Sequence, residues 1–270
     1  MIDDRPRFWS PPGIEGLELL AATFTDQVFP RHTHDHYVIG INLGGVEGFE
    51  RSGTRHVAPA GTIVTINPGD VHTGNAETEA PWVYRGFYPS VELISDITGI
   101  RGAVHFPSAV VDDADIFNKL LRAHTALECS TDELRRSSMV MMALHEFCAR
   151  YAGPRVPERP RIAAAARVAA ARALLLDRLE ENVTLSELAD AAGLSRFHLL
   201  RSFESHYGLP PHLYRLQQRV ERAKDLLGRR TDIATAALSS GFTDQSHLTR
   251  WFKRFVGVTP AAYRRGAKGR

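Results

Sequence analysis

The chain has 270 residues, of which 43% are hydrophobic and 24% are charged, and its formal net charge is +2. This length and apolar content allow two cores of ordinary size. The first residues lack the apolar segment of a secretory signal, and no apolar run approaches membrane-spanning length, which argues against secretion and membrane insertion. The two cysteines, Cys129 and Cys148, suit reduced thiols, so we expect a cytoplasmic protein.

Residues 1–153 are expected to form a β-rich domain. Runs rich in β-branched and aromatic residues, separated by Gly and Pro, occur at 17–24, 38–43, 62–66 and 83–87. Short strands at this spacing predict a small sandwich or barrel, for which a jelly roll is the natural candidate.

After residue 107 the pattern becomes helical. Asp112-Asp113 begin one helix and Thr131-Asp132 cap a second, so we expect a helical pair at about 111–151. The segment 154–162 is rich in proline, which predicts a stiff, extended linker between two domains.

Two segments of the β-rich part, residues 30–37 and 67–72, carry a group of histidines. His32, His34 and His36 alternate, so on a strand they would share one face, and His72 could come from the partner strand. Converging imidazoles of this kind can bind zinc, nickel or iron. They can also line a pocket for an organic effector, or form hydrogen bonds at a barrel mouth without any ligand. The aromatic residues that would help to wall such a pocket include Tyr37 and Trp82.

Charge is distributed unevenly along the chain. Residues 161–270 contain 19 Lys and Arg against 10 Asp and Glu, whereas residues 1–160 contain 14 against 21. A basic part joined to an acidic part indicates one domain that binds a polyanion and one that does not.

The basic part contains one segment twice. Leu185, Leu188, Ala189, Gly193 and Leu194 match Ile233, Ala236, Ala237, Gly241 and Phe242, 48 residues later, and Leu199, Arg201, Phe203, Gly208, Pro211 and Tyr214 match Leu248, Arg250, Phe252, Gly257, Pro260 and Tyr263, 49 residues later. Such repetition indicates one supersecondary unit used twice. The unit, a short helix, a Gly turn and a second helix, is typical of a helix-turn-helix. We expect the two motifs at about 185–206 and 233–255 of a domain spanning 163–270, joined by one long helix over 213–227.

Capping residues mark where these helices begin. Thr184 and Glu187 form a capping box before the first helix of the first motif, and Ser195 caps its second helix. In the second motif either Thr243 or Asp244 takes the place of Ser195. The residues expected to face inward from the second helix of each motif are Leu199, Phe203, Leu248 and Phe252.

The segment from Gly241 to Tyr263 resembles the carboxyl-terminal signature of the AraC/XylS transcription regulators, and both motifs match that family in order and spacing. The resemblance implies an all-α domain whose two recognition helices enter successive major grooves of double-stranded promoter DNA, about 34 Å apart. It also implies DNA contacts from Arg196, Phe197, Leu200, Arg201, Gln245, Ser246, Thr249 and Arg250. Related regulators pair two chains through helices like those at 111–151, so a homodimer is expected, with RNA polymerase as a further partner.

The two histidine segments resemble the conserved boxes of cupins, in the form found in sensor domains of the same regulators. The metal-binding cupin box has a Glu four residues after its second His, and Val38 occupies that position here. The resemblance therefore favours an effector site over a metal site, with His32, His34, His36, His72, Tyr37 and Trp82 as its residues.

Two classes of function remain for the whole chain, whose expected fold class is α+β with a cupin-like domain and an all-α domain. The favoured one is a ligand-responsive, sequence-specific transcription regulator without catalytic residues or a resident cofactor. The alternative is a cupin metalloenzyme, an oxygenase or isomerase, fused to a nucleic-acid-binding module. Val38 argues against the alternative, because an apolar side chain stands where the carboxylate of a metal-binding triad is expected.

Overall fold

The computed structural model describes residues 6–100, 102–129, 133–153 and 162–266. The chain divides into two compact units, of which the main part of the first is Met1–Val156 and the second is Pro157–Arg264. The predicted linker at 154–162 lies outside the described residues except for Ile162, which begins a helix. No helix in the described ranges has both the length and the apolar character that crossing a membrane requires.

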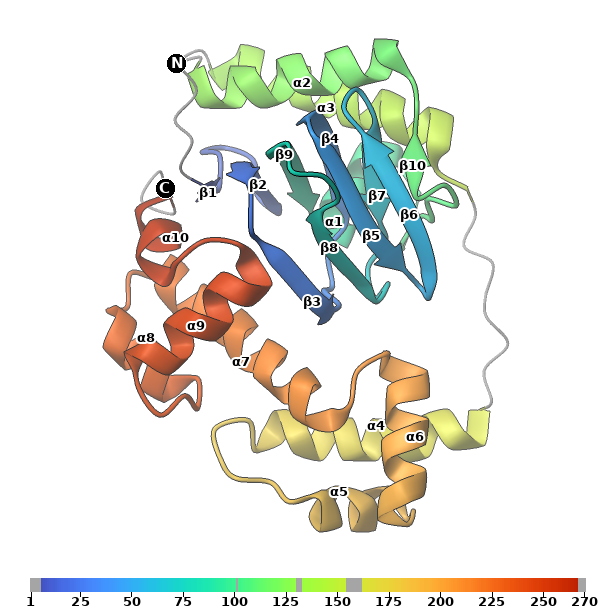
Figure 1. Ribbon diagram of the computed structural model, residues 1–270, viewed down its shortest axis with the longest axis vertical. Helices are drawn as coiled ribbons and strands as arrows, with labels where there is room; N and C mark the ends of the chain where they lie inside the picture. The colour runs from blue at the N-terminus through green and yellow to red at the C-terminus, as the bar shows by residue number, and fades with distance from the viewer. Residues whose placement is uncertain (1–5, 101, 130–132, 154–161, 267–270) are drawn as a thin grey trace. The chain divides into compact units, whose positions relative to one another are not determined.

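The first unit contains two antiparallel sheets (Figure 1). The six-stranded sheet has the order β1 (Arg7–Trp9), β2 (Leu17–Phe24), β9 (Trp82–Pro89), β4 (Val38–Gly44), β7 (Ile63–Ile66) and β10 (Val110–Val111). The four-stranded sheet has the order β3 (Val28–His32), β8 (His72–Ala76), β5 (Val46–Arg51) and β6 (Thr54–Pro59). The predicted jelly roll is thus confirmed as two facing sheets, which do not close into a barrel.

The four strands expected from their composition all belong to the six-stranded sheet. Of the four-stranded sheet, only the pairing of the strands that carry His32 and His72 was anticipated. The six-stranded sheet is covered on both faces, so residues in succession are buried along its central strands, as in β4 and β7, and most of them are aliphatic. The four-stranded sheet has a solvent face, where Glu50 and Arg55 are exposed. Its strands therefore contain charged residues and glycine, which weaken the strand pattern.

Helices α2 (Ala114–Cys129) and α3 (Glu133–Tyr151) pack together and cover one face of the six-stranded sheet (Figure 1). The core between them contains Leu19, Ile39, Ile41 and Phe87 from the sheet and Leu120, Leu144 and Phe147 from the helices. The helical pair predicted at 111–151 is therefore confirmed, although its expected caps at 131–132 lie outside the described residues. The sequence did not predict α1 (Val91–Thr98), which Ser90 caps by accepting a hydrogen bond from the backbone N–H of Leu93.

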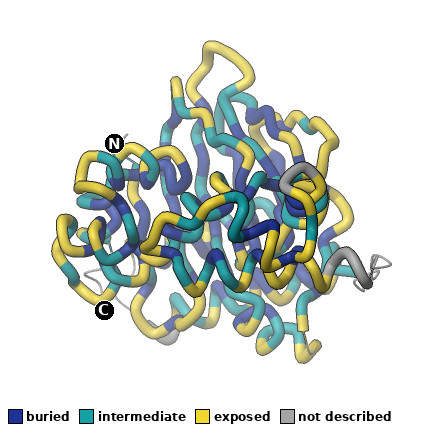
Figure 2. The backbone as a smooth tube through the Cα atoms, turned by 90° about the horizontal axis from the view of Figure 1, so that it is seen from below, coloured by how far each residue is buried: buried dark blue, intermediate teal, exposed yellow. Residues whose placement is uncertain are grey.

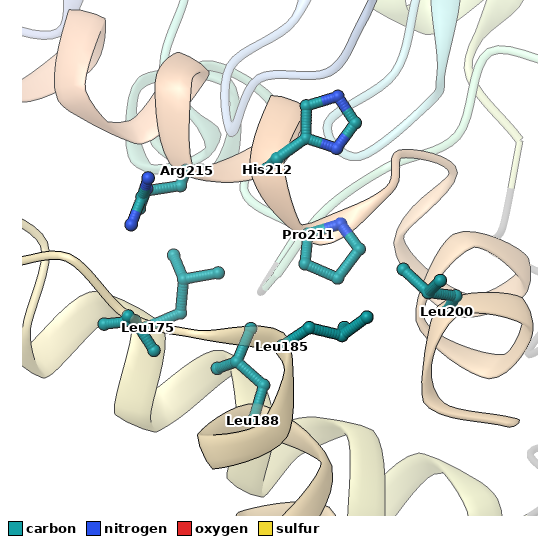
Figure 3. Close-up of a pocket in the computed structure, with 8 residues that line it drawn as sticks. Leu175, Leu185, Leu188, Leu200, Pro211, His212 and Arg215 are labelled. Atoms are coloured by element: carbon teal, nitrogen blue, oxygen red, sulfur yellow. The ribbon is translucent and has the colours of Figure 1, made fainter. Parts of the chain in front are cut away.

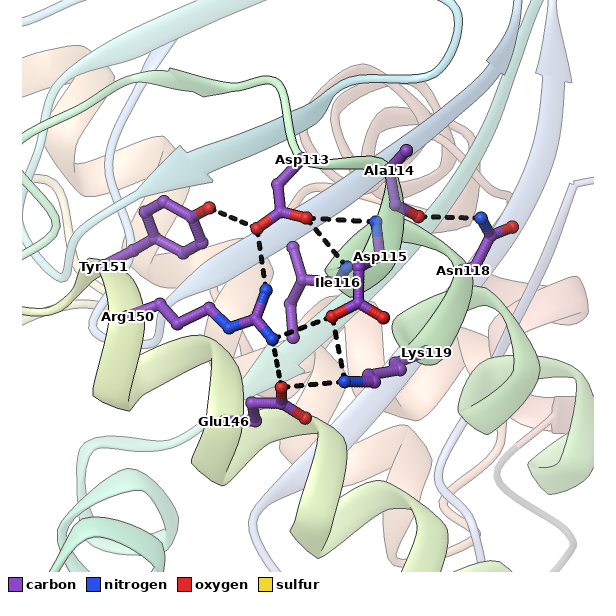
Figure 4. Close-up of polar contacts among 9 residues, drawn as sticks. All are labelled: Asp113, Ala114, Asp115, Ile116, Asn118, Lys119, Glu146, Arg150 and Tyr151. Atoms are coloured by element: carbon purple, nitrogen blue, oxygen red, sulfur yellow. Dashed lines mark hydrogen bonds and ion pairs between the residues drawn. The ribbon is translucent and has the colours of Figure 1, made fainter.

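A charged network joins the start of α2 to the end of α3 (Figure 4). The Oδ1 atom of Asp113 caps α2 by accepting from the backbone N–H of Ile116, at 3.1 Å. Its Oδ2 atom accepts from the Tyr151 hydroxyl at 2.5 Å and from Arg150 Nη1 at 2.9 Å. These bonds, that of Tyr151 foremost, lower the pKa of Asp113 to about 2. Asp113 is thus the cap that the sequence predicted and also the point where the two helices are tied.

The second unit is all-α, as predicted, and buried and exposed residues alternate along its helices (Figure 2). Its helices are α4 (Ile162–Asp177), α5 (Leu185–Ala192), α6 (Arg196–Tyr207), α7 (Pro211–Gly228), α8 (Ile233–Ser239), α9 (Gln245–Val256) and α10 (Pro260–Gly266). The pairs α5–α6 and α8–α9 are the two predicted helix-turn-helix motifs, and α7 is the long helix expected between them. Only α4 and α10 were not anticipated.

The buried guanidinium of Arg219, on α7, connects the segment after α4 with the turn of the second motif. Its Nε atom donates to the carbonyl of Leu179 at 2.7 Å and its Nη2 atom to that of Glu181 at 3.2 Å, so it satisfies carbonyl groups just beyond the end of α4. The turn of the second motif lies against the same group. A Cβ atom at Gly241 would be 2.7 Å from Arg219 Nε and 2.9 Å from the Cα of Glu180, and the φ angle there is +82°. Glycine is therefore required at this turn for both its conformation and the space around it.

Replacing Gly241 with alanine should destabilise the helical unit more than the same change at Gly193, the equivalent turn of the first motif. Gly193 also has a positive φ, +60°, but a Cβ atom added there would have no other atom within 4 Å. We expect a loss of about 1 kcal/mol in the free energy of unfolding for G193A, and about 2–4 kcal/mol for G241A, where overpacking is added. Urea unfolding in a W9F/W82F background, where Trp251 is the remaining tryptophan, measures both losses by fluorescence. Equal losses for G193A and G241A would show that Arg219 does not crowd the turn at Gly241.

His124, on α2, is buried against the sheet. Its ring lies edge-on to Trp9 and Phe87, with centroids 5.3 and 5.0 Å away, and its Nδ1 atom is 3.0 Å from Nη1 of Arg85. The same Arg85 nitrogen forms an ion pair with Glu128 at 2.7 Å. Burial first, and then the charge of Arg85, lower the pKa of His124 to about 3. The imidazole is therefore neutral in the folded protein and accepts the hydrogen bond from Arg85.

His124 should make the first unit less stable as the pH falls. Below about pH 6.5 the unfolded chain takes up a proton at this residue, whereas the folded chain does so only near pH 3. The contribution of His124 to the free energy of unfolding is therefore fully present above pH 6.5 and is lost as the pH falls below it. H124Q keeps a neutral acceptor for Arg85 but has no titrating group. It should reduce the slope of the free energy of unfolding against pH, between about pH 6 and pH 4, by about 1.4 kcal/mol per pH unit. Urea unfolding at several pH values measures this slope. The control is H145Q on the exposed side of α3, and parallel profiles for wild type and H124Q would exclude a buried neutral histidine.

Candidate DNA-binding surface and sensor site

The second helix of the first motif, α6, begins at a serine cap. The Oγ atom of Ser195 accepts a hydrogen bond from the backbone N–H of His198, and Leu199 and Phe203 are fully buried. Arg201 is exposed on the opposite face. The side chains of Arg196 and Phe197, which were also expected to contact DNA, lie outside the described residues.

Leu200, another expected DNA contact, is half-buried and lines an apolar pocket of about 170 Å³ within this unit (Figure 3). The pocket lies among α4, α5, α6 and α7, and its other lining residues are Leu175, Val183, Leu185, Leu188, Pro211, His212 and Arg215. The Leu200 side chain is thus partly occupied by packing within this unit. Its contact with DNA stays a prediction.

The second helix of the second motif, α9, repeats this arrangement. Its cap is Asp244, whose Oδ1 atom accepts from the backbone N–H of His247 at 2.7 Å, and this decides between the two caps left open by the sequence. Leu248 and Phe252 are fully buried. Among the expected contact residues, Gln245, Ser246 and Arg250 are exposed, and Thr249 is half-buried with its hydroxyl bonded to the carbonyl of Gln245.

Arg201 and Arg250 therefore occupy equivalent positions on equivalent helices. Each lies two residues after a fully buried leucine and two before a fully buried phenylalanine, and each is exposed. A guanidinium held on the outer face of a short, anchored helix suits bidentate contact with a guanine or a phosphate. The repeat that was visible in the sequence is thus a repeat of geometry as well.

In the first unit, three of the four predicted histidines converge. His32, His34 and His72 are all buried, and one ligand-type nitrogen from each lies within 4.8 Å of the others. His32 and His72 are paired across β3 and β8, as predicted. The expected alternation of His32, His34 and His36 along one strand is wrong, because β3 ends at His32 after an irregularity in register, and the other two lie in the following loop. His36 instead stacks on His34, with ring centroids 4.1 Å apart.

Each converging histidine is oriented by a backbone carbonyl two residues away. The Nδ1 atoms of His32, His34 and His72 lie 2.7, 2.9 and 3.0 Å from the carbonyl oxygens of Pro30, His36 and Asp70. A carbonyl oxygen only accepts, so each ring carries its proton on Nδ1 and a lone pair on Nε2. Burial is the main reason that the pKa of His32 is lowered to about 4 and that the pKa of His72 also lies well below its usual value. The rings of His32 and His72 are therefore neutral near pH 7.

A second set of bonds holds the turn before His72. Asp70 Oδ2 accepts from Arg51 Nε at 2.7 Å and from the Asn67 side chain at 3.0 Å. The N–H of Gly69, in the same turn, donates to the carbonyl of His34 at 2.9 Å. The turn and the histidine loop are thus fastened to each other, which brings residues 34 and 72 together although the sequence separates them widely.

The two aromatic residues expected at this site lie in different places. Trp82 is buried between the sheets, near Phe29 and Phe24, and its indole N–H donates to Asn42 Oδ1 at 2.9 Å. Phe29 in turn lies 6.2 Å from the ring of His32, so Trp82 shares the interior of the sandwich with the histidines. Tyr37, by contrast, belongs to the core beneath α2 and α3, and its hydroxyl donates to the carbonyl of Val104.

Glu47, a carboxyl group inside the sandwich, was not among the residues expected from the sequence. It is 6% exposed, and its Oε2 atom has no hydrogen-bond partner among the described residues. Burial raises its pKa to about 8, although a hydrogen bond from Asn42 acts in the opposite direction. The nearby Tyr84 is also buried, and its ring lies over Gly40 and Gly86. A strand prediction at 46–51 would have placed Glu47 on the same face as Phe49 and so inside the sandwich.

Comparison with known proteins gives a consistent result over nearly the whole chain. The AraC-like ligand binding domain matches residues 16–144, and a helix-turn-helix domain matches residues 188–266. YbfI of Bacillus subtilis, an uncharacterized HTH-type transcriptional regulator, is 30% identical over 230 residues, which cover 82% of each chain. The arabinose operon regulatory protein of Escherichia coli is 25% identical over 247 residues, which cover 86% of this chain and 81% of that protein.

Solved structures show the same fold. The alignment with ToxT from Vibrio cholerae covers 94% of this chain and 98% of the ToxT chain, with a TM-score of 0.59 and 10% sequence identity. A second ToxT structure, which contains an unsaturated fatty acid, has a TM-score of 0.56 at 11% identity. The pairing of a β-rich unit with this helical unit is therefore an established architecture.

The buried carboxyl group of Glu47 should make the first unit less stable as the pH rises. The folded chain keeps the proton of Glu47 up to about pH 8, whereas the unfolded chain releases it near pH 4.5. The contribution of Glu47 to the free energy of unfolding is therefore fully present below pH 4.5 and is lost as the pH rises to about 8. E47Q carries no titrating group and should reduce the slope between about pH 5 and pH 8 by up to about 1.4 kcal/mol per pH unit. Urea unfolding measures the slope, with E50Q on the solvent side of β5 as control. If E47Q retained the wild-type slope, Glu47 would not be buried as a neutral acid.

Proposed function

This chain belongs to the AraC family of transcription regulators, and we propose that a small molecule bound in its first unit controls how its second unit occupies promoter DNA. The names of YbfI and of the arabinose operon regulatory protein, which match most of the chain, support regulation rather than catalysis. One observation carries the proposal: the chain presents Arg201 and Arg250 at equivalent exposed positions of two recognition helices.

Promoter DNA is the partner of the second unit in this proposal. Residues 161–270 carry 19 Lys and Arg against 10 Asp and Glu, which favours a polyanionic partner. The helix α7 packs against helices of both motifs and so holds them in one relation. Two recognition helices held in this way suit successive major grooves on one face of the duplex, about 34 Å apart.

The effector site that we propose lies inside the sandwich, where His32, His34 and His72 converge and Trp82 and Glu47 are buried. Aromatic rings beside a few polar groups are typical of a small-molecule site. His36 is half-buried and stacks on His34, so it borders this group. ToxT, which has this fold, is solved with an unsaturated fatty acid bound, so a protein of this fold can take a small organic ligand.

A continuous series of contacts leads from the histidines to the helical pair. Asp70, whose carbonyl orients His72, is bound by Arg51. Arg51 Nη2 also donates to the carbonyl of Phe106 at 2.5 Å, and the ring of Phe106 lies 5.1 Å from that of Phe147 on α3. An effector that binds one arrangement of this series more tightly than another would shift α3, whereas equal affinity for both would change nothing.

In this proposal α2 and α3 also pair two chains into a homodimer. Met142, on α3, is 72% exposed and follows Ser138 on the side of the helix that faces away from the sheet. One exposed apolar side chain is common on a protein surface, so the homodimer is proposed from the resemblance of this helical pair to that of related regulators. A dimer would present two DNA-binding units to one promoter. The part of the dimer's surface that does not contact DNA would be available to RNA polymerase.

Replacing Arg250 with alanine tests the DNA-binding surface. If Arg250 contacts a guanine, R250A should lose about 1–3 kcal/mol of binding free energy, about 5- to 150-fold in affinity, and tolerate any base at one position. If Arg250 contacts only phosphate, affinity should fall equally on all sequences and the salt dependence should decrease by about one unit. Fluorescence anisotropy with the DNA upstream of the protein's own gene measures both quantities.

The matched control for R250A is R222A. Arg222 lies on α7 and forms an ion pair with Glu180 at 2.6 Å, so its removal deletes one positive charge of the same unit outside the recognition helices. R222A should bind the DNA nearly as wild type does. If R250A changed neither affinity, specificity nor salt dependence, Arg250 would not be part of the interface.

A further inference from the structure

The imidazole rings of His32, His34 and His72 lie close together in the first unit. We propose that these three histidines bind a divalent transition-metal ion of the zinc class. The inference deepens the proposed function, on which it rests, by making a metal ion part of the effector site. These are the histidines of the cupin-like segments, and Val38 stands where a metal-binding cupin box has its carboxylate, so the proposed site has imidazole ligands alone.

The positions of the nitrogens carry the first part of the argument. One ring nitrogen of each histidine lies within 4.8 Å of a ring nitrogen of each of the other two. Nitrogens bound to one zinc ion at about 2.0–2.1 Å lie about 3.0–3.5 Å from each other. Small rotations of the rings therefore suffice to bring them to coordination distance.

The orientation of the rings carries the second part. In all three, Nδ1 faces a backbone carbonyl oxygen at 2.7–3.0 Å, which directs the lone pair to Nε2. Histidines that bind metals almost always donate their other ring N–H to a carbonyl or a carboxylate in this way. The Asp70 carbonyl that orients His72 belongs to a turn held by Arg51, so this support is itself fixed by an ion pair of 2.7 Å.

The chemistry of the donors selects the kind of ion. All three donors are imidazole nitrogens, which suit Zn²⁺, Ni²⁺, Cu²⁺ and Fe²⁺, whereas Mg²⁺ and Ca²⁺ require oxygen ligands. Three protein ligands leave at least one coordination position for a further donor. An effector of matching chemistry would offer an oxygen or nitrogen atom to that position.

Metal titration of the full chain, purified without a histidine tag and freed of metal by a chelator, tests the proposal. Co²⁺ serves as the probe because its visible absorption reports nitrogen coordination, and Zn²⁺ is then added in competition. We expect one Co²⁺ per chain, displaced by Zn²⁺, and a higher Tm for the Zn²⁺ form. H34A and H72A should weaken Co²⁺ binding about 100-fold or more, whereas H145A, which removes an exposed histidine of α3 outside the group of three, should bind like wild type.

Several outcomes would overturn the proposal. Wild-type protein that binds no stoichiometric Co²⁺ would show that the histidines form hydrogen bonds only, and this result is independent of whether the variants fold. Equal binding by wild type and by folded H72A, with circular dichroism as the check, would place the ion elsewhere. DNA binding is measured on the same samples: if it persists where metal binding fails, the metal site alone is wrong, and if wild type binds no promoter DNA, the proposed function is wrong.

Discussion

The DNA-binding unit depends on one buried guanidinium, that of Arg219. Its donors satisfy the carbonyl groups of Leu179 and Glu181 beyond the end of α4, and the turn at Gly241 lies directly against it. A buried charge without partners is costly, so this group is stable only while α4, α7 and the second motif keep their positions. Lysine, with a single point charge, could not reproduce two bonds of fixed direction. The end of α4 and the second motif are therefore tied to α7 through this one group, while α7 packs against helices of both motifs.

The first unit uses buried polar groups differently. Arg51, Asp70 and Asn67 satisfy each other and hold a turn, whereas Glu47 retains an oxygen without a partner among the described residues. Such a group reduces the stability of the folded unit, and polar groups of this kind are expected at functional sites. The histidines and Glu47 are therefore the residues on which the proposed effector site rests.

The charged network of Asp113, Arg150 and Tyr151 complements the apolar packing of α2 and α3. Packing between the helices and the sheet sets their depth, but apolar contacts alone allow helices to slide. Directional bonds at the junction of the two helices set their register (Figure 4). A helical pair with fixed register can transmit a displacement from Phe106 as a unit, which is what the proposed control of the DNA-binding unit requires.

The sequence by itself determined the features that depend on neighbours along the chain. Caps at Thr184 and Ser195 and the spacing of buried residues in both motifs are local, so the helix-turn-helix repeat could be predicted almost to the residue. Strands covered on both faces, such as β4, were equally visible because they are rich in aliphatic and β-branched residues. Only the tertiary structure decided the four-stranded sheet, the arrival of His34 beside His72, the burial of Glu47 and the role of Arg219. Each of these depends on partners far away in sequence, and a polar side chain has the same letter whether it is solvated or buried against such a partner.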